Sequence, residues 1–126
     1  MYADGEDNES SSKRYTPPAG IKITDYAANS SSVIDLFNNL LNGTNGIPRV
    51  TSNDFLFVWT FGHGARDQDD NYSILLKDGL FEDTLFSPLV NNIPANKKAV
   101  WMQQCHSGGF ANTLIWFFIP HVNRIS

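Results

Sequence analysis

The feature that most constrains the fold is a pair of apolar runs, each of which ends in a polar or glycine-rich turn. The first run is residues 54–61 (DFLFVWTF), and the second is residues 99–102 (AVWM), preceded by two lysines. Nearly unbroken apolar runs of this length are typical of strands buried on both faces of a sheet. We therefore expect two strands of a mostly parallel sheet in an α/β fold, with the first run as a central strand.

The aromatic residues of the first run alternate with smaller residues. Phe55, Phe57, Trp59 and Phe61 share one face of the expected strand, and residues 56, 58 and 60 share the other. Successive side chains of a strand point to opposite faces. Both sets are expected to be core, and the aromatic set is not read as a ligand-binding surface.

The rest of the chain suggests helices and short strands around these two runs. Ser30, Ser31 and Ser32 offer an N-cap for a helix over 32–42, and Gly43 suits its C-terminal cap. A strand over 72–76, closed by Asp78-Gly79, precedes a helix over 82–92 that contains Pro88. Further expectations are a polar loop over 3–20, a strand stub at 21–23, an acidic loop over 65–71, and a helix from Phe110 to about Ile115 opened by Ser107-Gly-Gly109.

Length and composition limit the classes of protein. The 126 residues are 41% hydrophobic, which suits one domain with a core, and the net charge is −4 with nine scattered Lys and Arg. Without a basic face, nucleic acid is not an expected partner. The apolar stretch at 114–119 is far shorter than the roughly 20 residues of a membrane span. No signal peptide is evident at the given start, and the compartment stays open; a secreted or periplasmic bacterial protein is compatible with a truncated N-terminus.

The only cysteine, Cys105, lies in a turn directly after the second apolar run, and His63 lies in a Gly-His-Gly turn after the first. In parallel sheets, ligands bind outside the carboxyl ends of the strands. The two side chains are therefore expected to share one crevice. Cys105 would act as nucleophile and His63 as acid/base, with the backbone N–H groups of Gly64 and Cys105 facing an oxyanion.

At these residues the sequence resembles the caspase-like cysteine peptidases, which include the legumain-type family, caspases, metacaspases, clostripain and gingipains. Their shared pattern is an apolar strand before His-Gly, then a second apolar strand with a short polar step before the nucleophilic cysteine. Here those blocks are FLFVWTFGHG and AVWMQQC. Cys105 follows His63 by 42 residues, as in legumain-type members and fewer than the roughly 50 of caspases. Gln104 replaces the caspase alanine, and CHSGGF is more similar to bacterial and metacaspase-like branches.

The resemblance implies a three-layer caspase-like fold, a mostly parallel sheet flanked by helices, incomplete at both ends. Residues 1–126 would form one partial peptidase domain: a polar loop over 1–20, a core over 21–113, and the truncated start of the substrate-pocket region over 114–126. The implied activity is cysteine endopeptidase cleavage of a peptide or protein substrate, possible only weakly or not at all in such a fragment. The missing strands would come from the rest of a parent protein or from another chain.

Other interpretations of the same residues stay open. The chain could be a non-catalytic caspase-like binding or scaffold module, or the product of a truncated reading frame. His106 suits a structural or rim position, and His63, Cys105 and His106 lack an evident fourth ligand for zinc. No cofactor is expected, although calcium remains a minor alternative because one loop has alternating oxygen ligands. The residues of that alternative are Asp67, Asp69, Asn71 and Asp78.

Overall fold

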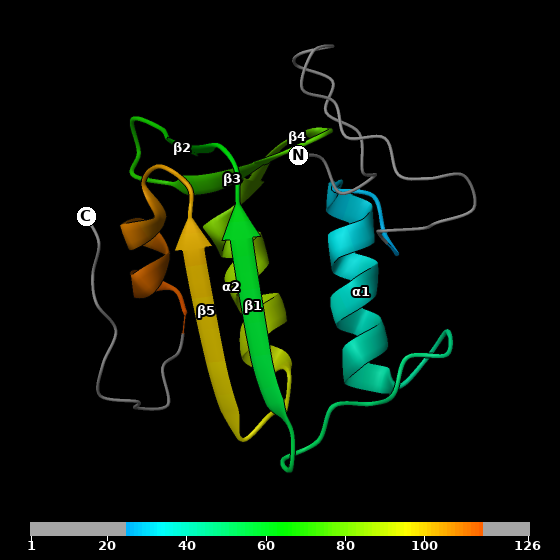
Figure 1. The fold of residues 1–126 in the computed structure, drawn as a ribbon. Helices are drawn as coiled ribbons and strands as arrows, with labels where there is room; N and C mark the ends of the chain where they lie inside the picture. Colours follow the sequence, from blue (N-terminus) through cyan, green and yellow to red (C-terminus); the bar gives the residue numbers. More distant parts are fainter. Residues whose placement is uncertain (1–24, 115–126) are drawn as a thin grey trace.

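The computed structural model describes residues 25–114, which form a mixed α/β unit (Figure 1). Two strands form a parallel pair, three short strands form an antiparallel sheet, and two α-helices and one 3₁₀ helix complete the unit. The elements in chain order are α1 (Ser30–Asn42), β1 (Phe55–Phe61), β2 (Gly64–Arg66), β3 (Tyr72–Leu76), β4 (Gly79–Glu82), α2 (Asp83–Asn92), β5 (Lys97–Gln103) and the 3₁₀ helix η1 (Ser107–Asn112).

The two apolar runs pair with each other, as the sequence predicts. β1 and β5 are parallel and in register from Phe55 opposite Lys97 to Phe61 opposite Gln103. The antiparallel sheet, in the order β2-β3-β4, lies across the end toward which both arrowheads point (Figure 1). The carboxyl ends of β1 and β5 therefore lie together, next to the short sheet that follows β1 in the chain.

The core lies between the parallel pair and the helices, on one face of the sheet. The Phe86 ring of α2 makes edge-to-face contacts with Phe37 of α1 and Phe110 of η1, with ring centroids 6.1 and 5.9 Å apart. Leu56, Val58, Val100 and Met102 of the parallel pair pack against this cluster. Burial of these apolar side chains is the main favourable term that holds the helices against the parallel pair.

Helix α1 forms where the sequence predicts it, but a different residue caps its N-terminus. The cap is Asn29, whose side-chain oxygen accepts a hydrogen bond from the Ser32 amide at 2.9 Å. The prediction that the serines provide the cap was wrong, because all three lie within the helix. At the other end Gly43 has φ 71°, a left-handed conformation that a glycine adopts at low cost, as predicted.

The carboxylate of Asp78 adds a second cap to α1. Both of its oxygens accept from the Ser30 amide at 3.0 Å, and this bond lowers the pKa of Asp78. A group with a lowered folded pKa stabilises the native state above its unfolded pKa, and the contribution disappears as the pH falls through the folded value.

We expect Asp78→Ala to lower the melting temperature at pH 7. The difference in melting temperature between Asp78→Ala and the unmodified chain should shrink as the pH falls below about 4, where aspartates protonate. Thermal melts followed by circular dichroism from pH 7 to pH 2.5 measure this gap. Asn38→Ala, on the same helix, is the control: it removes no carboxylate, so any difference in melting temperature that it causes should not change with pH. An Asp78→Ala gap of constant size at all pH values would contradict the capping role.

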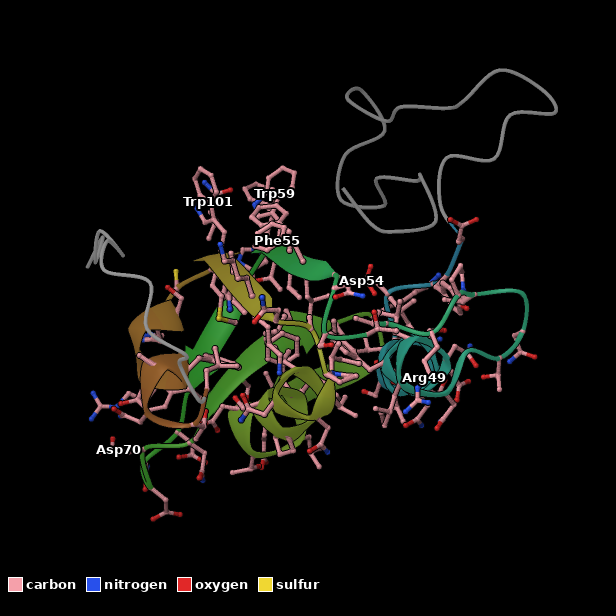
Figure 2. All side chains as sticks on the ribbon, turned by 90° about the horizontal axis from the view of Figure 1, so that it is seen from below. Arg49, Asp54, Phe55, Trp59, Asp70 and Trp101 are labelled. Atoms are coloured by element: carbon pink, nitrogen blue, oxygen red, sulfur yellow. The ribbon has the colours of Figure 1, made fainter. Side chains whose placement is uncertain are left out.

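The outer face of the parallel pair differs from the prediction. The four aromatic side chains of β1 are 53–71% exposed, and Trp101 of β5 is 56% exposed. Phe55, Trp59 and Trp101 point to the side of the sheet opposite α2 (Figure 2). Within residues 25–114 the strands are thus buried on one face only, and β1 has a single neighbour rather than a central position.

Smaller differences concern the loops. The acidic segment predicted as a loop begins with strand β2, which pairs with β3, and the helix predicted from Phe110 is a 3₁₀ helix that already begins at Ser107. The strand over 72–76, its turn, and the helix with Pro88 inside it are confirmed. The predicted features at 3–20, 21–23 and beyond 114 lie outside the described residues. No helix within residues 25–114 is long and apolar enough to cross a membrane.

Candidate active site

Two turns at the same end of the parallel pair carry the predicted catalytic residues. The last paired residues are Phe61 and Gln103, and His63 and Cys105 each lie two positions further along the chain. Both side chains are exposed. The chain leaves β1 at Gly62, which has φ 148°. Residues with a side chain rarely adopt this conformation, and glycine adopts it readily. The parallel register therefore brings both turns to the same edge, as the sequence predicts.

The backbones of the two turns are in direct contact at Gly64. A Cβ atom at this position would collide with the carbonyl oxygen of Cys105 and would lie 2.8 Å from Cγ of Gln104. Only a residue without a side chain allows this approach. Gly64 thus fixes the His63 turn against the Cys105 turn, and a larger residue would force them apart.

Two backbone amides at this contact are positioned to donate. The His63 carbonyl accepts from the Leu75 amide at 2.9 Å, and Gly64 is opposite Ile74 in the next position of the ladder. Hydrogen-bonded and non-hydrogen-bonded pairs alternate in antiparallel sheets, so the Gly64 N–H points away from β3. The Cys105 N–H makes no hydrogen bond with residues 25–114. The two predicted oxyanion donors therefore have no hydrogen-bond acceptor within residues 25–114.

Cys105 itself lies in a tight turn. The Ser107 amide donates to the Gln104 carbonyl at 3.3 Å, which places Cys105 and His106 at the two central positions. His106 has φ 61° and ψ 16°, a left-handed conformation that is unfavourable for a residue with a side chain. The chain then enters η1, where a Cβ atom at Gly109 would collide with the ring of Tyr72. The cysteine turn thus contacts β2 at Gly64, and the helix η1 that follows it contacts β3 at Tyr72.

A buried polar pair lies beneath the two turns, and the sequence analysis missed it. Gln104 is only 6% exposed, and its Oε1 accepts from the Thr60 hydroxyl at 2.8 Å. Its Nε2 is buried without a hydrogen-bond partner. The strand period could have shown this, because Gln104 continues the inward positions of Val100 and Met102, and Thr60 is opposite Met102. Gln104 therefore joins β1, β2 and the cysteine turn at one point.

This pair allows a double-mutant test of the buried amide. We expect Thr60→Val to lower the free energy of unfolding by about 1–3 kcal/mol, because the whole Gln104 amide is then buried without a partner. Adding Gln104→Met should restore the loss, since both polar partners and the unpaired Nε2 are removed together. Urea unfolding of the two single variants and the double variant measures this coupling. Additive losses in the double variant would contradict it.

The geometry does not support the metal alternatives. Asp67 accepts from the Asp69 and Asn71 amides and from the Asn71 side chain, so its two oxygens close its own loop, and these bonds lower its pKa. Asp78 is bound instead to α1. Of the four predicted calcium residues, Asp78 therefore lies apart from the loop that contains the other three. Across residues 25–114, no group of three or more His, Cys, Asp or Glu side chains could hold a metal, the set of His63, Cys105 and His106 included.

The two turns form one open edge that carries the Cys105 thiol, the His63 imidazole and the N–H groups of Gly64 and Cys105. The turns come from segments far apart in the sequence, and their backbones meet at Gly64. Comparison with known proteins adds no further constraint on what this arrangement does. No protein-family model, no curated protein and no solved structure matches the chain.

Proposed function

We propose that this chain is the catalytic core of a cysteine endopeptidase similar to the caspase-like group. Cys105 is the nucleophile, His63 is the acid/base, and the N–H groups of Gly64 and Cys105 stabilise the oxyanion. The observation that carries the proposal is the contact of the Gly64 backbone with the Cys105 carbonyl, which holds the His63 turn against the cysteine turn. Both turns follow the carboxyl ends of adjacent parallel strands, where such folds bind ligands.

The chemistry needs only these groups and water. His63 takes the thiol proton, and Sγ of Cys105 attacks the carbonyl carbon of the scissile bond. The resulting oxyanion accepts from the two backbone amides, and His63 protonates the amine that leaves as the C–N bond breaks. Water, deprotonated by His63, then hydrolyses the thioester and releases the acid and the thiol. Within residues 25–114, no hydrogen bond joins the exposed side chains of His63 and Cys105. Catalytic hydrogen bonds are often long or poorly aligned without substrate and tighten when it binds.

The proposal does not extend to the three-layer arrangement of that group. Residues 25–114 provide a parallel pair and a layer of helices on one of its faces (Figure 1). No helix of these residues covers the outer aromatic face.

Alkylation of Cys105 by iodoacetamide tests the pairing with His63, because the thiolate is the reactive form. We expect the native chain to react at pH 7 roughly ten times faster than the chain unfolded in urea, and His63→Ala to remove this advantage. His106→Ala, on the other side of the cysteine, is the matched control and should retain it. Equal rates for the unmodified chain and His63→Ala would argue for the non-catalytic alternative.

A further inference from the structure

The outer side of the parallel pair is a continuous aromatic surface, which we term the aromatic face. Its side chains are 53–71% exposed, and none of the elements in residues 25–114 packs on them. Phe55, Trp59 and Trp101 point in the same direction, away from α2 (Figure 2). The members of the aromatic face are Phe55, Phe57, Trp59, Phe61 and Trp101.

The size of the aromatic face approaches that of a protein interface. Side chains of this kind each have about 150–250 Å² to bury, so five of them, a little more than half exposed, present roughly 600 Å². That is the upper end of the largest apolar patch on a typical monomer. A stable complex buries about 800 Å² on each partner. With its polar borders included, the aromatic face is therefore large enough to hold a second protein surface.

We propose that this face binds the same face of a second copy of the chain. Face-to-face sheets pack about 10 Å apart and need large and small side chains to interdigitate. The register provides this match on β5, whereas all four outward positions of β1 are aromatic, so that on β1 rings would stack on rings. Trp59 and Trp101 form one row, and Phe57 and Ala99 form the next, so that Ala99 leaves the only small position between large rings.

A two-fold axis that lies between the two copies, perpendicular to their strands, places β1 over β1 and β5 over β5 of the partner. It places the Trp101 ring of one copy over Ala99 of the other, and Phe57 over Trp59. At the ends of the face, the same axis brings Lys97 of one copy to Gln103 of the other, so that polar ends meet polar ends. Each copy then provides the cover for the outer face of its partner, an isologous arrangement that closes as a dimer.

The Trp59 indole strengthens this assignment because it is held in place before association. Its Nε1 donates to Oε1 of Gln103 at 2.8 Å, across the two strands. Fixed aromatic side chains lose little conformational entropy on binding, and tryptophans are common at the centres of interfaces. The proposal rests on the aromatic face alone, and it holds whether or not Cys105 is a nucleophile.

Sedimentation of the purified chain from 1 to 100 μM tests the proposal. We expect a monomer–dimer equilibrium, with tryptophan emission shifting to shorter wavelength as the dimer forms, because two of the three tryptophans lie on this face. Trp101→Lys should raise the dissociation constant about thirtyfold or more. Leu80→Lys is the matched control: Leu80 is similarly exposed, at 58%, but lies on β4, and its substitution should leave the equilibrium unchanged.

Cross-linking tests the orientation. Chains with Lys97→Cys and with Gln103→Cys, both in a Cys105→Ala background, should form a disulfide between copies when mixed and none when kept separate. Four results would overturn the proposal: a monomer at every concentration, a monomer with already buried tryptophans, growth into irregular aggregates, or no cross-link in the mixture. The second of these would show that another part of the same chain covers the face.

Discussion

We expect Cys105→Ala to abolish peptide-bond cleavage by the intact protein, and His63→Ala to lower the cleavage rate by roughly a thousandfold or more. In the proposed mechanism, the first substitution removes the atom that bonds to the substrate, and the second removes the group that takes and returns the proton. Groups that act as a unit in this way lose most of the catalysis when either is deleted. The measurement is the hydrolysis rate of a peptide panel varied at the residue before the cleaved bond, which also reports the substrate preference.

Two controls keep this result interpretable. His106→Ala changes the neighbour of the nucleophile without removing a proposed catalytic group, and should retain most of the activity. Circular dichroism should show that each variant retains its fold, which is expected because His63 and Cys105 are both exposed. Full activity in either Cys105→Ala or His63→Ala would refute the mechanism.

Gly64→Ala is expected to have the largest effect on the fold around the site. The new methyl group would collide with the Cys105 carbonyl, which belongs to the backbone and cannot turn aside like a side chain. Overpacking of this kind lowers the free energy of unfolding by about 1–3 kcal/mol. The two turns must separate to admit the methyl group, so cleavage should fall with stability. Urea unfolding and the peptide assay measure the two effects.

Gly108→Ala is the matched control for this substitution. Gly108 also lies beside the cysteine turn, but a Cβ atom there meets no atom within 4 Å. Its replacement should be neutral or slightly stabilising, because alanine reduces the conformational freedom of the unfolded chain. Equal stability of Gly64→Ala and Gly108→Ala would show that the two turns are not held in contact at Gly64.

Local sequence patterns predicted most of the elements correctly. The helix before Gly43, the two apolar strands, the strand over 72–76 with its turn at Asp78-Gly79 and the helix that contains Pro88 each depend on spacing, capping and turn residues within a short window. The placement of His63 and Cys105 at one edge also followed from sequence, because it needs only the rule that parallel strands end on the same side.

The errors concern choices between similar local signals. Asn29 and the serines after it are all good capping residues, but the helix begins at Ser30, two residues before its predicted start, and this leaves Asn29 at the capping position. The residues of the calcium alternative bond to backbone amides instead: Asp67 bonds within its own loop, and Asp78 bonds to the start of α1. A bond to a residue 48 positions away has no signature in the sequence around Asp78.

The sequence alone predicted the longer strands and helices, but not β2 or β4, and it identified the two turns that carry a thiol and an imidazole. Tertiary structure decided the rest, because it depends on contacts between distant segments. Only the packed chain shows that Gly64 must lack a side chain to meet Cys105, that Gln104 and Thr60 share a buried hydrogen bond, and that the aromatic side of β1 lies open. Alternation along a strand defines two faces, but only the neighbouring elements determine which face is covered.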